Sequence, residues 1–154
     1  MSKKGFTLIE VLVVIGIIAI LAAIVIIAIN PAKQFAQARN TERQSSVNAI
    51  LNAIGQRMTD NKGIFAGTFG SYICPAITAT STIYSAPTTA SSTIDLSCLT
   101  PTYISTLPMD PTAGSGDNTG YTVAVDSTGR VSVCAPAAAT ETALIDAKTI
   151  CIKR

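Results

Sequence analysis

The chain has 154 residues, of which 48% are hydrophobic and only 13% are charged, and its formal net charge is +2. This length allows one long helix and one modest domain, and so small a charge gives no strong basic surface for nucleic acid. The sequence contains no histidine. A catalytic triad that needs histidine is therefore excluded, as are zinc and haem sites with histidine ligands.

The first predicted element is a long apolar helix. Residues 11–29 follow Glu10 without a single charged side chain. As a helix rising about 1.5 Å per residue they would be roughly 28 Å long, close to the ~30 Å hydrocarbon core of a bilayer. We therefore expect residues 6–30 to span a membrane. An ordinary secretory signal fits less well, because its apolar region is usually only about 7–15 residues long.

Glu10 is the exception at the head of this apolar segment. A carboxylate near the start of a membrane helix costs on the order of a few kcal/mol unless it is paired or reaches the interface. One interpretation is that Glu10 extends to interfacial water. The other is that it has a charged partner in a second subunit, and the residues around it favour this alternative.

A short motif surrounds Glu10. After a basic leader with Lys3 and Lys4, the chain reads Gly5-Phe6-Thr7-Leu8-Ile9-Glu10. This resembles the processing site of type IV prepilins and pseudopilins. The resemblance implies that a prepilin peptidase removes residues 1–5 by cutting between Gly5 and Phe6, and then N-methylates Phe6. Because four residues make about one helical turn, or ~6 Å, the cationic amine of one subunit could pair with Glu10 of a neighbour. Such a pair would specify register more than stability.

Asn30 and Pro31 end the apolar run. Pro31 either kinks the helix or lies in the first turn of a second helix that Asn30 caps. Residues 31–60 are expected to form an amphipathic helix, with Phe35 and Ala38 as candidates to extend its apolar stripe. The stripe follows helical spacing and consists of Val47, Ile50, Leu51, Ile54 and Met58.

Charged residues occur in the first half of this amphipathic helix. Arg39, Glu42 and Arg43 have the spacings of helical side-chain pairs. We interpret them as a solvated outer face, with an inter-subunit contact as the alternative.

Residues 61–154 are predicted to form an exported domain. The segment between Cys74 and Cys98 is rich in serine and threonine, which favours an exposed loop, with O-glycosylation as an alternative. Alternating apolar residues predict a hairpin over residues 121–133 with a turn at 126–129, and a last strand follows at 149–152. The expected fold is α+β: a long N-terminal helix packed on a small antiparallel β-sheet, as in pilins.

Four cysteines, all after residue 70, indicate an oxidising compartment. They allow three pairings, of which we favour Cys74 with Cys98 and Cys134 with Cys151. Cys134 and Cys151 would each lie on the strand face opposite the aliphatic side chains, where a bond ties down the last strand. A four-cysteine metal site is disfavoured, because the spacings are wide and no CxxC is present.

A second resemblance concerns residues 107–111, Leu-Pro-Met-Asp-Pro, and the glycine-rich acidic loop after them. This segment resembles the turn before the calcium-binding loop of major pseudopilins. The resemblance implies that Asp110, Asp117 and Asn118 could supply oxygen ligands to Ca²⁺. Thr112 stands where the family has an aromatic residue. The alternative is an ordinary exposed turn, and no cofactor is then expected.

The predicted function is structural. The chain is expected to be a subunit of a type IV pilus-like filament, held as a single-pass precursor in the cytoplasmic membrane and assembled into a homo-oligomeric helical filament at the cell surface. The implied partners are a prepilin peptidase, an assembly ATPase and a platform membrane protein, with no specific nucleic acid. The alternatives are a pseudopilin of type II secretion and a monomeric, membrane-tethered binding domain, for which calcium dependence is an option. An enzyme is least expected.

Overall fold

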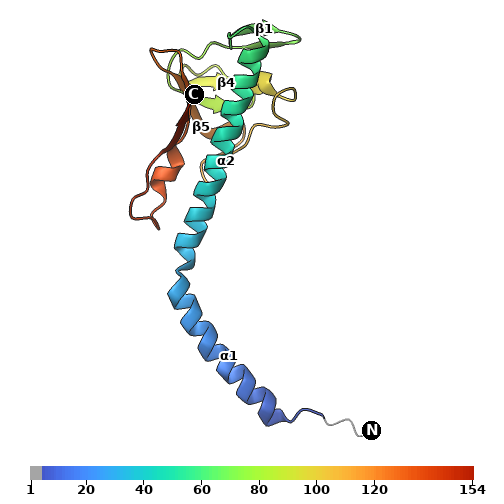
Figure 1. Cartoon of the computed structure of the whole chain (residues 1–154), viewed down its shortest axis with the longest axis vertical. Helices are drawn as coiled ribbons and strands as arrows, with labels where there is room; N and C mark the ends of the chain where they lie inside the picture. The colour runs from blue at the N-terminus through green and yellow to red at the C-terminus, as the bar shows by residue number, and fades with distance from the viewer. Residues whose placement is uncertain (1–4) are drawn as a thin grey trace. The chain divides into compact units, whose positions relative to one another are not determined.

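The computed structural model describes residues 5–154, so the first four residues of the predicted leader lie outside the described residues. The chain divides into two compact units, the first ending at Phe35 and the second being Ala36–Arg154. Figure 1 shows the order of the elements along the chain. The α+β class predicted from the sequence is confirmed, since two helices accompany small, mainly antiparallel sheets.

Helix α1 is Leu8–Ile29. It ends at Asn30, whose backbone is left-handed (φ 47°, ψ 78°), a conformation that asparagine tolerates better than most residues. Pro31 is the first residue of the next helix, α2 (Pro31–Asp60). A proline fits there because its missing N–H would have no helical partner in the first turn. The side-chain oxygen of Asn30 accepts a hydrogen bond from the Lys33 amide at 3.3 Å. Of the two sequence interpretations, the structure has the capped second helix.

The apolar stripe of α2 packs into the second unit. Four of its five side chains are at most 3% exposed, and the fifth, Met58, is half-buried. The four buried side chains are Val47, Ile50, Leu51 and Ile54. Burying an aliphatic side chain of this size contributes about 1.5–3 kcal/mol, so this face holds the helix on the domain. The expected extension of the stripe is wrong, because Phe35 is 65% exposed and Ala38 is also exposed. The buried residue in this part of the helix is Ala36. It lies seven residues, or about two helical turns, before buried Arg43 and so on the same face of the helix.

The main sheet has five strands in the order β4-β3-β5-β6-β7. The strands are β3 (Ser81–Tyr84), β4 (Thr93–Asp95), β5 (Asn118–Val125), β6 (Val131–Ala135) and β7 (Ile150–Lys153). All neighbours are antiparallel except β3 and β4, which run parallel. The predicted hairpin is present as β5 and β6, with Val125 opposite Val131. Two short 3₁₀ helices, η1 (Ser97–Leu99) and η2 (Pro136–Thr140), and a separate hairpin of β1 (Gly67–Phe69) with β2 (Tyr72–Cys74) complete the unit.

The serine- and threonine-rich segment is not simply an exposed loop, and this expectation is corrected. It contributes β3 and β4 to the main sheet, with Ile83 fully buried and Ile94 only 5% exposed. β-Branched threonine and isoleucine suit a half-buried pleated surface. The two buried isoleucines therefore draw their polar neighbours into strands, although residues 87–92 between them remain largely exposed.

One hydrophobic core lies between α2 and the main sheet. Buried residues of the strands, among them Ile83, Tyr121, Val123 and Val133, join the stripe of α2 in a single cluster. Cys74 is bonded to Cys98, and Cys134 to Cys151, the two pairings favoured from the sequence. Cys134 and Cys151 are direct partners across β6 and β7, with Cα atoms 4.1 Å apart. Closing a loop of 17 residues contributes about 3 kcal/mol in the chain-entropy view.

Candidate functional site

The carboxylate of Glu10 is held at the start of α1 by Thr7. Glu10 Oε2 accepts hydrogen bonds from the Thr7 backbone N at 2.8 Å and from Thr7 Oγ1 at 2.7 Å. In return, the Glu10 amide donates to Thr7 Oγ1 at 3.4 Å. This is a capping box, in which two unpaired donors of the first helical turn are satisfied reciprocally. Phe6 and Gly5 come directly before it and are exposed. Within a single chain, Glu10 therefore has its hydrogen-bond partner in Thr7, at the start of its own helix.

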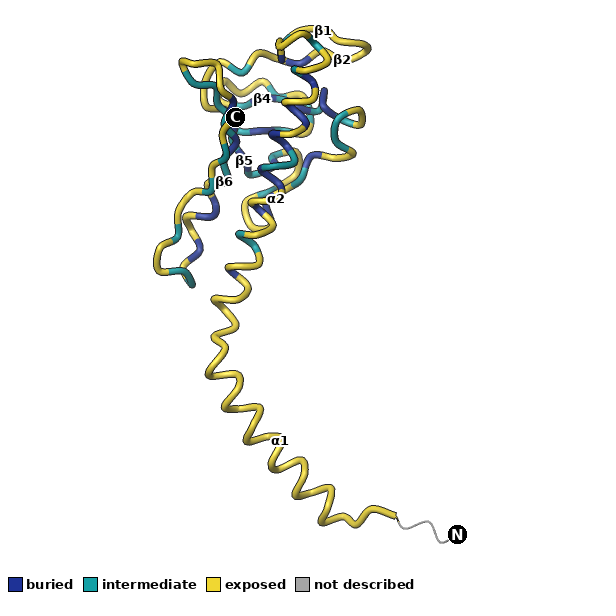
Figure 2. Tube along the Cα trace, in the orientation of Figure 1, coloured by how far each residue is buried: buried dark blue, intermediate teal, exposed yellow. Residues whose placement is uncertain are grey.

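Helix α1 is an uncovered apolar cylinder. None of its 22 residues is buried, as the uniformly exposed tube in Figure 2 shows. Its length of about 33 Å matches a bilayer core, and among the described residues it is the one helix long and apolar enough to cross a membrane. Glu10 is its one charged residue. So much exposed aliphatic surface calls for cover by lipid or by other apolar helices.

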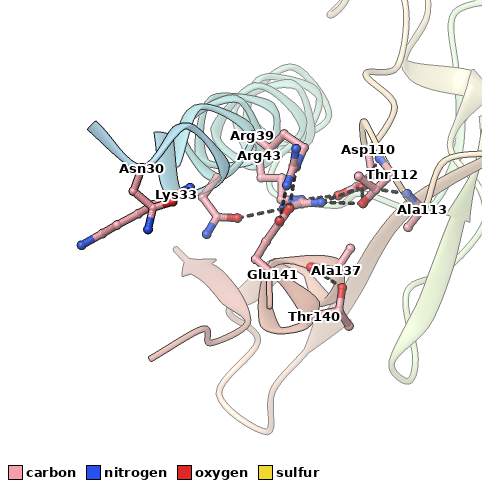
Figure 3. Close-up of polar contacts among 11 residues, drawn as sticks. Asn30, Lys33, Arg39, Arg43, Asp110, Thr112, Ala113, Ala137, Thr140 and Glu141 are labelled. Carbon is pink, nitrogen blue, oxygen red and sulfur yellow. Dashed lines mark hydrogen bonds and ion pairs between the residues drawn. The ribbon is translucent and has the colours of Figure 1, made fainter. Parts of the chain in front are cut away.

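Four charged side chains form a cluster in the second unit, of which Arg39 is partly exposed and the other three are buried: Arg39, Arg43, Asp110 and Glu141 (Figure 3). Arg43 is fully buried and donates from Nε to Asp110 Oδ2 at 2.7 Å and from Nη2 to Asp110 Oδ1 at 3.2 Å. Its Nη1 donates to Glu141 Oε1 at 2.5 Å. Arg39 lies one turn earlier and forks onto the same carboxylate, at 2.8 and 2.5 Å.

The cluster balances two guanidinium groups against two carboxylates. The hydrogen bond from Arg39, together with Arg43, lowers the pKa of Glu141 to about 2. Burial by itself would raise the pKa of Asp110, but hydrogen bonds from Arg43 and from two backbone amides bring it below its usual range. Both acids are therefore ionised near neutral pH. Buried charges persist only when they are paired and hydrogen-bonded, and the planar forks of arginine meet that condition.

This cluster corrects the interpretation of Arg39, Glu42 and Arg43 as a solvated face. Glu42 is exposed, but Arg43 is among the most deeply buried side chains of the protein. The sequence did contain a signal, because Arg43 lies four residues before Val47 and so continues the apolar stripe. Glu141 was missed altogether. The sequence marks Glu141 in one way only: it is the single charged residue between Arg130 and Asp146.

Asp110 also organises the loop that follows it. Its Oδ1 accepts hydrogen bonds from the amides of Thr112 and Ala113, both at 2.9 Å, and its own amide donates to the Thr119 carbonyl at 2.8 Å. Gly120 passes so close that a Cβ there would lie 2.8 Å from the Asp110 Cβ, and its φ is +78°. The loop is thus folded around one carboxylate that Arg43 neutralises.

Comparison with protein-family models finds a match to the prokaryotic N-terminal methylation motif over residues 1–29. The chain carries the type IV pilin and pseudopilin signature. No significant match was found among curated proteins or among solved structures. The matched segment contains Gly5, Phe6 and Glu10. It indicates a structural subunit rather than an enzyme, implies processing by a prepilin peptidase and assembly with a membrane machinery, and fits a membrane-anchored precursor.

In this pilin-like chain the three predicted calcium ligands make separate contacts. Both carboxylate oxygens of Asp110 accept from protein donors, Asn118 Oδ1 accepts from the Gly120 amide, and the Asp117 carboxylate is exposed near Ser85. Within residues 5–154, no three His, Cys, Asp or Glu side chains are grouped to hold a metal ion. The donor set around Asp110 does not fit calcium as it stands, since an ion there would have to displace the Arg43 guanidinium.

Proposed function

We propose that the protein is a structural subunit of a type IV pilus-like filament, stored in the cytoplasmic membrane and assembled through α1. The observation that carries this proposal is the bare apolar helix Leu8–Ile29 with Glu10 at its head, inside the methylation motif. Lipid and the interior of a bundle of such helices are similarly apolar. Transfer between them has little hydrophobic driving force, so specific contacts must decide how subunits register.

Glu10 would provide that register. After cleavage between Gly5 and Phe6, the new N-terminal amine is cationic near neutral pH, and methylation keeps its charge. In the proposed filament the amine of one subunit pairs with Glu10 of its neighbour. The bonds from Thr7 to Glu10 keep the carboxylate satisfied before assembly. Such a pair sets position along the helix even where it adds little stability. The implied partners are the peptidase, an assembly ATPase and a platform membrane protein.

The first test is electron microscopy of the surface fraction sheared from the native host, labelled with antibody against the second unit. Long labelled filaments are expected, and their absence would contradict the proposal. Glu10→Ala should still insert and be cleaved but should yield few filaments. Thr7→Ala is the matched control, because it removes the capping hydroxyl but keeps the Thr7 amide bond to Glu10 and the charge of Glu10. Normal filament yield from Glu10→Ala would refute the register role.

A second candidate is a pseudopilin of a type II secretion system. It is favoured by the resemblance of residues 107–111 to the turn of major pseudopilins. In this turn the Asp110 carboxylate accepts hydrogen bonds from the amides of Thr112 and Ala113 and so orders the loop that follows. In that case the protein should remain in the membrane fraction, and its deletion should block export of a secreted enzyme. A third candidate, the monomeric tethered binding domain, predicts neither filaments nor a secretion defect, and no ladder of chemically crosslinked subunits.

A further inference from the structure

A loop that carries one fully exposed aliphatic side chain connects η2 to β7 in the second unit. We call residues 142–149 the tip loop. Ile145 in this loop is fully exposed, at 101% of its reference area, and Asp146 beside it is exposed too. The loop has fixed ends. Glu141 holds its start to α2 through Arg39 and Arg43, and the bond from Cys151 to Cys134 holds its end.

A groove of about 450 Å³ lies in the same unit, between α2 and the start of β6. Apolar side chains form its floor, among them Leu51, Ile54, Met58 and Val131. The guanidinium of Arg154 is at its edge and donates a hydrogen bond to Asn52. The groove is thus large enough for an aliphatic side chain and has a basic group at its edge.

The tip loop and the groove lie at different levels of α2. Glu141, the residue before the tip loop, contacts α2 at Arg39 and Arg43, whereas the groove is lined by helix residues between 51 and 59. A separation of sixteen positions, from residue 39 to residue 55, corresponds to about 24 Å along the helix. Figure 1 shows the segment after β6, in orange and red, reaching along α2 away from the sheet. A projection and a groove offset in this way cannot meet within one molecule.

We propose that the tip loop of one subunit docks into the groove of a second copy of this chain, with Ile145 on the apolar floor and Asp146 beside Arg154. The charge next to Ile145 is complementary to the charge at the groove edge, since Asp146 is acidic and Arg154 is basic, while Lys148 lies three residues beyond Ile145. A contact between two different surfaces of identical subunits is heterologous, and it repeats into a helical array when the rotation does not close. This inference rests on the proposed filament, for which it names a contact between the second units of two subunits.

The test is site-directed crosslinking in sheared filaments from the full-length protein. All four natural cysteines are in disulfides, so introduced thiols can be targeted. Ile145→Cys combined with Gln56→Cys, treated with a short bismaleimide, should give a ladder of dimers, trimers and higher species on a denaturing gel. Each single variant should stay monomeric. The control pair Ile145→Cys with Ser91→Cys should also give no ladder, because exposed Ser91 lies between β3 and β4, at the sheet edge opposite β7.

A charge exchange provides an independent measurement. Asp146→Arg and Arg154→Asp should each lower filament yield several-fold, and the double variant should restore much of it. Lys148→Glu, in the same loop, should leave the yield unchanged. If the unaltered protein forms filaments but the cysteine pair gives no ladder and the charge exchange does not restore filament yield, the docking contact is refuted. The proposed filament function would still stand. Absence of filaments from the unaltered protein would instead refute the proposed function, and the docking with it.

Discussion

Replacing Arg43 tests whether the buried cluster holds the second unit together. Arg43→Met keeps an unbranched chain of moderate size but removes the guanidinium. Asp110 then loses both bonds from Arg43, and Glu141 keeps only Arg39. The two carboxylates stay where burial disfavours their charge. Removing one partner of a buried pair costs about 3–5 kcal/mol, against total stabilities of about 5–15 kcal/mol for ordinary domains.

Arg39→Met is the matched control. Arg39 belongs to the same cluster and contacts Glu141, but its side chain is 35% exposed, so water can replace what it loses. We expect its effect to be clearly smaller than that of Arg43→Met. Arg43→Lys should fall between the two, because lysine keeps the charge but cannot reproduce the fork that spans Asp110 and Glu141.

The assay is urea unfolding of the full-length protein in detergent micelles, followed by tyrosine fluorescence, since the chain has no tryptophan. Tyr121 is fully buried and reports on the core beside α2. The midpoint should fall strongly for Arg43→Met with an unchanged denaturant slope. A loss of less than about 1 kcal/mol for Arg43→Met, or a loss no larger than that of Arg39→Met, would refute the reasoning, because a buried Asp110 carboxylate without its guanidinium partner should cost several times more.

Three further predictions follow from the same region. The free energy of unfolding should decrease as the pH falls from about 4.5 towards about 2, because the pKa of Glu141 is about 4.5 in the unfolded chain and about 2 in the folded one. Urea titrations at a series of pH values measure this decrease, and a flat profile would contradict the prediction. Gly120→Ala should lose more stability than Gly129→Ala, since both have positive φ but only the Cβ at Gly120 would collide with Asp110; equal losses, each about 1–2 kcal/mol from backbone strain alone, would disprove the close approach. Exchange of Ca²⁺ for EDTA should leave Tm unchanged, because Arg43 occupies the carboxylate of Asp110, and a calcium-dependent rise in Tm would restore the calcium-binding alternative.

Local patterns in the sequence determined the helices and the last two strand pairs. The apolar run after Glu10, the break at Asn30 and Pro31, and the alternation on both sides of residues 126–129 depend only on neighbours along the chain. The N-terminal motif is equally local, since Gly5, Phe6 and Glu10 fall within one short segment. One of the favoured disulfide pairings could also be reached, because strand alternation places Cys134 and Cys151 on matching faces.

The tertiary structure alone decided the surroundings of Arg43, Asp110 and Glu141. The two carboxylates are separated by 67 and 98 positions from Arg43, and no local pattern encodes which distant carboxylates meet a given guanidinium. Ile83 is similar, because its burial depends on the sheet order that places β3 beside β5. Periodicity fixes which face of an element is apolar. Periodicity does not determine which polar groups are buried beside that apolar face. This depends on how the elements pack, because a charge is tolerated in the core only where an oppositely charged partner is buried with it.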